Sequence, residues 1–135
     1  MSDMDERLNS LGIVLPDVMP PVMDGYLPTF APFARSGDQI HLSGRLGKVD
    51  GKPLCGKVGE EVSLEQGKLA ARGVAIELLA VLKAAVGDLN NVGRIVKLCV
   101  MVNGAPNFTE PRRVADGASE LLVQVFGATQ GGKSI

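Results

Sequence analysis

Apolar residues recur at helical spacing over residues 63–86 of the chain. Ser63 and Gln66 have the spacing of a capping box, and Gly87 supplies the left-handed residue that often ends a helix. One stripe of this helix mixes polar with apolar residues, namely Glu65, Lys68, Arg72, Ile76, Leu79 and Lys83. A helix lying alone on a surface would keep that stripe polar, so we expect its second half to be covered on two sides.

Two further helices are predicted. One begins near Thr109, tolerates Pro111 in its first turn and ends at residues 126–127. Its inward positions follow the spacing of a single buried face: Val114, Ala118, Leu121, Leu122 and Val125. The other helix is short, covers residues 5–11 and is stopped by Gly12.

Alternating residues predict strands around a turn within residues 30–47. Ser36, Gly37 and Asp38 lie between two short runs, which indicates a hairpin. In the second run, one side carries Ile40 and Leu42, and the other carries Gln39, His41, Ser43 and Arg45. Residues 47–62 are rich in glycine and predict an exposed loop or a loose second hairpin.

Residues 93–104 have the pattern of a central strand. One face is apolar through Val96, Leu98, Val100 and Val102, and the other is nearly as apolar through Ile95, Cys99 and Met101. A strand of this kind is usually buried on both faces. Cys99 is therefore interpreted as a small buried hydrophobic residue, whereas Cys55 is interpreted as an exposed loop thiol.

The order strand, strand, helix, strand, helix predicts an α+β fold with two helices on one face of an antiparallel sheet. We expect a single domain over residues 1–135, divided into an extended lead-in (1–28), a core (29–127) and a flexible end (128–135). Folds of this plan return to the sheet after their second helix. We expect that C-terminal strand to be missing, so that either the sequence continues past Ile135 or another element completes the sheet.

Composition narrows the class of protein. Of 135 residues, 45% are hydrophobic and only 4% aromatic, and the net charge is −1, so we expect no nucleic-acid partner. The longest mostly apolar run, residues 74–86, is too short to span a bilayer, and the acidic N-terminus is unlike a signal peptide. We expect a cytoplasmic protein with reduced cysteines, without membrane contact, metal or cofactor.

Residues 127–134, GATQGGKS, match the phosphate-loop pattern G-x-x-x-x-G-K-[ST]. This pattern binds phosphate only between a strand and a helix, where backbone N–H groups converge on the anion. Here a predicted helix precedes the pattern and only Ile135 follows it, so Gly127 is interpreted as a helix cap. The near match GKPLCGKV, residues 51–58, contains Pro53, which has no N–H, and no helix follows it directly. We predict nucleotide binding at neither stretch.

Three stretches give the chain a resemblance to the Rid family, the YjgF-like reactive-intermediate deaminases formerly labelled endoribonuclease L-PSP. They are FAPFARSGDQIHLSGRLG, the segment from GKVGEEV to NGAPNF (residues 56–108), and GASELLVQVFG. The resemblance runs from about Leu8 to Gly127 and is strongest for the branch with the longer N-terminal lead-in, here RLNSLGIVLP. The order and spacing of the stretches carry it, since no single motif is diagnostic.

The resemblance implies a chorismate-mutase-like fold, related to the ferredoxin-like fold, and a homotrimer with ligand clefts between subunits. Other subunits would then cover the surfaces that one subunit leaves apolar. The deaminases of this family hydrolyse enamine and imine intermediates of amino-acid metabolism to 2-oxo acids and ammonia. The implied partners are therefore further copies of this chain and a small carboxylate or imino-acid ligand.

The resemblance also assigns ligand-binding residues by position. Ser43 and Gly44 match the turn whose backbone N–H holds the substrate carboxylate. Phe30 stands where the deaminases have a cleft tyrosine, Arg45 replaces the usual glutamine, and Asp116 falls near a cleft asparagine. The arginine and the water-orienting glutamate of the family lie in terminal strands that this chain lacks, so the catalytic residues stay unknown.

Three functions remain open at this point. The first is a trimer that binds small carboxylates and hydrolyses imines, and the second is a non-catalytic ligand-binding or regulatory trimer. The third is the ribonuclease activity of the old family label, which we rank last for want of a basic surface or an acid–base pair. His41 and Ser43 share a strand face but lie about 6–7 Å apart, too far for the hydrogen bond of a catalytic pair.

Overall fold

The computed structural model describes residues 3–17 and 30–127. These residues form two compact units, one made of residues 3–17, 30–45 and 76–92, the other of residues 46–75 and 93–127. Residues 1–2 and 18–28 of the expected lead-in and all of the expected flexible end, residues 128–135, lie outside the described residues. The expectation of a single domain with these internal boundaries stays a prediction.

Helix α1 (Asp3–Ser10) opens the first unit and packs against η1 (Leu89–Asn91), a single 3₁₀ turn. Leu8 and Leu89 are buried, and Ile13 continues the apolar surface past the helix. Lys83 Nζ lies 2.9 Å from the Asp5 carboxylate. The predicted N-terminal helix is confirmed, although it begins two residues earlier than expected.

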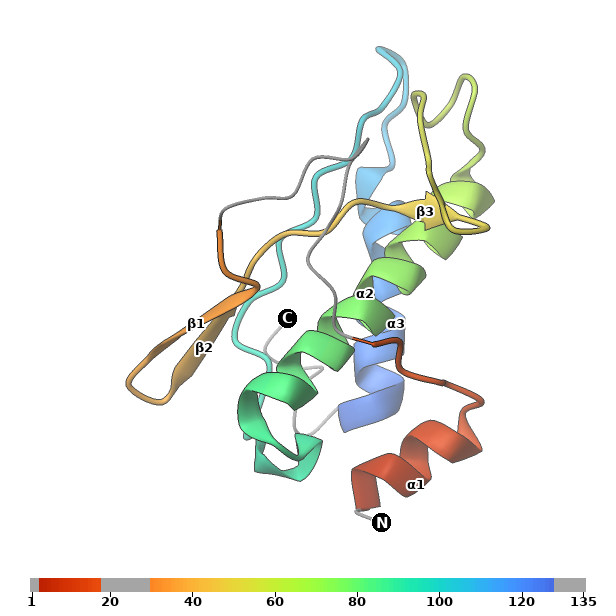
Figure 1. Ribbon diagram of the computed structural model, residues 1–135. Coiled ribbons are helices and arrows are strands. Elements are labelled where there is room, and N and C mark those ends of the chain that lie inside the picture. Colours follow the sequence, from red (N-terminus) through yellow and green to blue (C-terminus); the bar gives the residue numbers. More distant parts are fainter. Residues whose placement is uncertain (1–2, 18–29, 128–135) are drawn as a thin grey trace. The chain divides into compact units, whose positions relative to one another are not determined.

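Strands β1 (Phe33–Ser36) and β2 (Gln39–Leu42) form the predicted hairpin in the same unit (Figure 1). Gly37 adopts a positive φ of 59° in the two-residue turn between them, which a residue with a β-carbon rarely accepts. Ile40 and Leu42 are half-buried, while Gln39 and His41 are exposed. Strand β2 therefore has the two faces that its alternation predicts.

The second unit begins with a smaller hairpin of strands β3 (Lys48–Val49) and β4 (Lys52–Pro53). Asp50 and Gly51 both have positive φ, 53° and 78°, which is the conformation of a type I′ turn. This is the loose second hairpin that the glycine-rich stretch predicts.

Helix α2 (Leu64–Val86) runs through both units. The predicted capping box is present: the Gln66 N–H donates to Ser63 Oγ at 3.1 Å, and the Ser63 N–H donates to Gln66 Oε1 at 2.9 Å. Gly87 ends the helix with φ at 85°, and its N–H donates to the Lys83 carbonyl.

The second half of α2 is covered on more than one side, as its mixed stripe predicts. The consecutive residues Leu79, Ala80, Val81 and Leu82 are all buried. Four consecutive residues of a helix point in directions about 100° apart, so their joint burial requires neighbours around most of the circumference.

Helix α3 (Pro111–Phe126) lies along the first half of α2 in the second unit. All five predicted inward residues are buried. Two glycines allow the close approach. A β-carbon at Gly67 would lie 3.3 Å from the Val114 side chain, and one at Gly117 would lie 2.9 Å from the Lys68 carbonyl carbon.

The prediction of a central strand over residues 93–104 is wrong. This segment is extended, yet it pairs with no strand among the described residues and only bridges to Val58 at Gly104. Leu98, Val100 and Val102 are half-buried, whereas Cys99 and Met101 are exposed. An apolar pattern on both faces shows that a segment can form a buried strand. It does not specify which other strand would pair with it.

The α+β class is confirmed, with helices and small antiparallel sheets. Within residues 3–17 and 30–127, no helix combines the length and the apolar character that a membrane crossing requires.

Candidate functional site

Ser43, which directly follows β2, is fixed by two hydrogen bonds to the chain segment before β1. Its N–H donates to the Pro32 carbonyl at 3.0 Å, and its Oγ–H donates to the Ala31 carbonyl at 2.6 Å. Both donors of Ser43 are therefore used to close the base of the hairpin. The hydroxyl proton therefore positions the turn.

Gly44 presents the next backbone N–H along the chain. Among the residues that the structure describes, no acceptor bonds to this N–H. Open space surrounds the residue, because a β-carbon built there would meet nothing within 4 Å. An N–H that is held in place by its neighbours and lacks a protein acceptor is suited to bind an anion.

Four of the five residues assigned by resemblance lie in the first unit. Phe30 directly precedes Ala31, the acceptor of the Ser43 hydroxyl, and 54% of its surface is exposed. Arg45 is half-buried next to Gly44. Phe30 is thus linked to the Ser43–Gly44 turn through its neighbour Ala31, whose carbonyl accepts the hydrogen bond from the Ser43 hydroxyl.

Asp116, the fifth residue, belongs to the second unit. It is exposed on α3, next to Gly117. Asp116 is therefore described within the second unit alone, apart from the other four residues.

His41 takes no part in a catalytic pair with Ser43. The hydroxyl of Ser43 is bonded to the Ala31 carbonyl, and His41 is exposed opposite Ala34 in the hairpin register. His41 lies on the exposed face of β2, which agrees with its interpretation as a polar-face residue, and a role in a subunit interface stays a prediction.

The two cysteines are free and exposed. Exposure of Cys55 is as predicted, whereas the prediction of a buried Cys99 is wrong, because nothing in the described chain covers its face of the segment 93–104. In the described ranges, no group of three or more His, Cys, Asp or Glu side chains is placed to hold a metal ion.

Gly127 ends α3 with φ at 83°, and its N–H donates to the Val123 carbonyl at 2.7 Å. The interpretation of Gly127 as a helix cap is confirmed. A helix, not a strand, therefore leads into the phosphate-loop pattern, whose remaining residues lie outside the described part of the chain.

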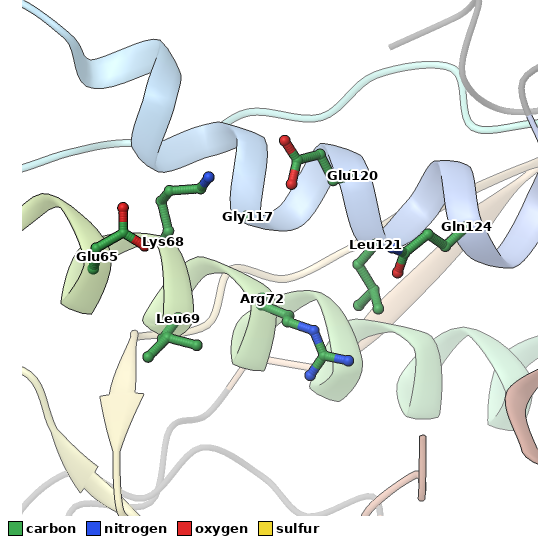
Figure 2. Close-up of a pocket in the computed structure, with 8 residues that line it drawn as sticks. All are labelled: Glu65, Lys68, Leu69, Arg72, Gly117, Glu120, Leu121 and Gln124. Carbon is green, nitrogen blue, oxygen red and sulfur yellow. The ribbon is translucent and has the colours of Figure 1, made fainter. Parts of the chain in front are cut away.

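A second feature, which sequence reasoning missed, is a groove between α2 and α3 with a volume of about 150 Å³ (Figure 2). Its floor contains Gly117 and Leu121, and its sides carry Glu65, Lys68, Arg72 and Glu120. The sequence shows the charges of α2 as a polar stripe. A glycine within the apolar pattern of α3 is the only local sign that another helix approaches closely there.

A family model described as "YjgF/chorismate mutase-like, putative endoribonuclease" matches residues 5–134 of this chain. Protein TCP17 from Trypanosoma cruzi is 41% identical over 126 residues, which cover 93% of this chain and 76% of that protein.

Two crystal structures are similar to the described fold. A putative endoribonuclease from Shewanella oneidensis MR-1 has a TM-score of 0.83 and 30% identity, covering 96% of this chain and 84% of the other. The protein Atu1372 from Agrobacterium tumefaciens, described as having unknown function, has a TM-score of 0.77 and 34% identity, covering 95% and 76% of the two chains.

Proposed function

The chain belongs to the YjgF/chorismate mutase-like family, and on that premise we propose that it is a homotrimeric Rid-like protein that binds small carboxylates at the Ser43–Gly44 turn. The observation that carries the proposal is the Gly44 N–H, which has no acceptor in the described chain while both donors of Ser43 are committed to residues 31–32. A donor held in place before the ligand arrives needs little reorganisation on binding.

Self-association is the second part of the proposal. Exposed apolar residues lie on the extended segment 93–104, where Met101 is 92% and Val96 is 57% exposed. The segment also pairs with no described strand and is bridged only at its end, where the Asn103 carbonyl accepts from the Val58 N–H, so we infer that another copy pairs with the remainder of its backbone. Large exposed apolar side chains beside unpaired extended backbone are typical of an interface.

Binding is tested by titrating 2-oxobutyrate or benzoate while following the backbone amide resonance of Gly44. We expect a saturable shift at Gly44. Replacement Gly44→Ala leaves the fold intact, because the added β-carbon meets nothing within 4 Å. The methyl group obstructs the approach to the N–H, and loss of one charge-assisted hydrogen bond weakens binding roughly tenfold or more.

The matched control is Gly73→Ala, on α2, where a β-carbon also meets nothing within 4 Å. This variant is expected to bind 2-oxobutyrate as the wild type does. The binding proposal is wrong if neither ligand produces a saturable shift at Gly44, or if both glycine variants bind equally well.

Imine hydrolysis is the activity that the family resemblance implies for a bound carboxylate. The assay generates 2-aminoacrylate in situ and follows the release of ammonia and 2-oxo acid. Acceleration by the protein assigns the enamine/imine deaminase activity, whereas binding without acceleration assigns the non-catalytic role. Phe30 and Asp116 differ from the residues of the family's deaminases, which makes this assay decisive.

Cleavage of RNA ranks last among the candidate activities. The word endoribonuclease belongs to the family description and to the Shewanella protein. This chain has a net charge of −1 and 4% aromatic residues, which does not suit binding to a phosphate backbone. The proposal places the protein in the cytoplasm, where its free thiols, Cys55 and Cys99, stay reduced.

A further inference from the structure

The groove between α2 and α3 gathers four charged side chains from two helices. Lys68 and Arg72, one turn apart on α2, are half-buried, and Glu65 and Glu120 are exposed at its sides. None of these four side chains forms an ion pair or a hydrogen bond with another described residue. Two cations one turn apart repel each other when nothing neutralises them.

The sign of the charges restricts what can bind there. Two cations and two carboxylates line the same small groove, so a simple anion meets the carboxylates and a simple cation meets the lysine and arginine. A zwitterion satisfies both kinds of charge. Figure 2 shows the side chains of Lys68 and Glu120 extending toward one another from the two helices, on either side of Gly117.

The floor of the groove is apolar and low. Leu121 is buried beneath it, and Leu69 is 65% exposed at its edge. Gly117 contributes no side chain, because the carbonyl of Lys68 occupies the space that a β-carbon would need. The accessible apolar surface of the groove is therefore that of Leu69, and a short aliphatic group can contact it while polar ends reach the charged sides.

Size sets the last limit. The groove measures about 150 Å³, which is below the range of roughly 300–1,000 Å³ that holds drug-sized ligands. Its occupant is correspondingly small.

We propose that the groove between α2 and α3 binds a small aliphatic α-amino acid. Lys68 and Arg72 hold the carboxylate, Glu120 accepts hydrogen bonds from the ammonium group, and the side chain packs against the exposed Leu69. This site is separate from the Ser43–Gly44 turn and does not rest on the proposed function.

The test is an amide-resonance titration of the full chain with L-valine and two analogues that each lack one charged end. The analogues are 3-methylbutanoate, which has no ammonium group, and isobutylamine, which has no carboxylate. We expect L-valine to shift the amides of Lys68, Gly117 and Glu120 saturably, and each analogue to bind roughly tenfold more weakly or worse, because it loses a charge-assisted interaction.

Two variants assign the ends of the ligand. Arg72→Gln is expected to weaken L-valine binding about tenfold, whereas Arg112→Gln, an exposed arginine at the start of α3 outside the groove, leaves it unchanged. Glu120→Gln is expected to weaken L-valine binding while 3-methylbutanoate binds as well as before or better, which a purely structural role of Glu120 would not produce. Circular dichroism confirms that each variant is folded.

The inference is overturned if L-valine produces no saturable shift at these amides, if Arg72→Gln and Arg112→Gln bind it equally, or if 3-methylbutanoate binds as tightly as L-valine. Shifts at Gly44 alone would also overturn it, while supporting the separate carboxylate site. The outcomes for the two sites are thus distinguishable in one set of spectra.

Discussion

At Gly117 the backbone of α3 comes so close to α2 that an added β-carbon would lie 2.9 Å from the Lys68 carbonyl carbon and closer still to its oxygen. Gly117→Ala therefore has to push the helices apart. We expect it to lower the free energy of unfolding by about 1–3 kcal/mol, the usual cost of overpacking, or more. Urea denaturation with an unchanged m-value measures the difference.

Gly73→Ala is the matched control within α2. No atom lies within 4 Å of its β-carbon position, so the substitution should follow helix propensity and raise the free energy of unfolding by up to about 1 kcal/mol. Equal stabilisation by both substitutions would contradict the close approach at Gly117.

Glu61 is the residue whose protonation should affect stability. The Lys57 N–H, which donates to Glu61 Oε2 at 3.0 Å, the N–H of Glu61 itself and the nearby Lys57 charge hold the pKa of the Glu61 carboxyl below its ordinary value. Because the pKa is lower in the folded state, the stabilisation is present above the unfolded-state pKa. It is lost as the pH falls through the folded-state pKa.

We therefore expect Glu61→Gln to be less stable than the wild type at neutral pH, with a difference that shrinks in acid. Thermal unfolding from neutral to acidic pH measures it. Glu60→Gln, the neighbouring exposed carboxylate, serves as the control. A difference for Glu61→Gln that stays constant with pH would show that its hydrogen bond does not depend on the charge.

At the scale of the elements, the stability of α2 depends on the capping box in its first turn. Ser63 and Gln66 satisfy each other's N–H groups, and Ser63→Ala should cost about 1 kcal/mol, within a usual range of roughly 0.5–2 kcal/mol. A double-mutant cycle with Gln66→Ala, measured by urea denaturation, should find the two losses strongly non-additive. Additive losses would mean that the two side chains act independently.

The capping box could be predicted from the sequence because its hydrogen bonds join residues three positions apart. The same holds for the end of α2 at Gly87 and for the buried face of α3, both of which follow from local periodicity. The segment 93–104 could not be predicted in this way, because a strand needs a partner that its own residues do not specify. The groove depends on Gly117 meeting Lys68, two residues far apart in the chain.

The candidate site could be predicted only in part. The resemblance selected Ser43 and Gly44, but it gave no sign that the Ser43 hydroxyl is used within the protein, bonded to the Ala31 carbonyl. That bond joins two segments twelve residues apart, and the turn chemistry between them only implies that they meet. That the Gly44 N–H has no acceptor among the described residues is a property of the folded chain.

For the whole molecule, the proposed trimer should dissociate when a charge is placed in its apolar interface. Met101 is 92% exposed on the extended segment, and Met101→Glu would place a charge in an apolar interface, where an unpaired charge is strongly unfavourable. We expect sedimentation equilibrium at micromolar concentration to find a trimer for the wild type and a monomer for this variant.

Leu69→Glu is the control for that experiment, since Leu69 is also exposed and apolar but lies on α2 beside the groove. It should leave the trimer intact. A wild-type protein that is monomeric and well folded at that concentration would contradict the trimer directly.

The contact at Gly117 also restricts how α2 and α3 can move. A screw motion of α3 by one residue, a rise of about 1.5 Å with a rotation of about 100°, would bring Asp116 or Ala118, each with a β-carbon, against the Lys68 carbonyl. Such a screw motion is therefore blocked in both directions, while rocking about the glycine is not. Any motion that widens the gap between α2 and α3 on one side of Gly117 should pivot at this glycine and narrow the gap on its other side.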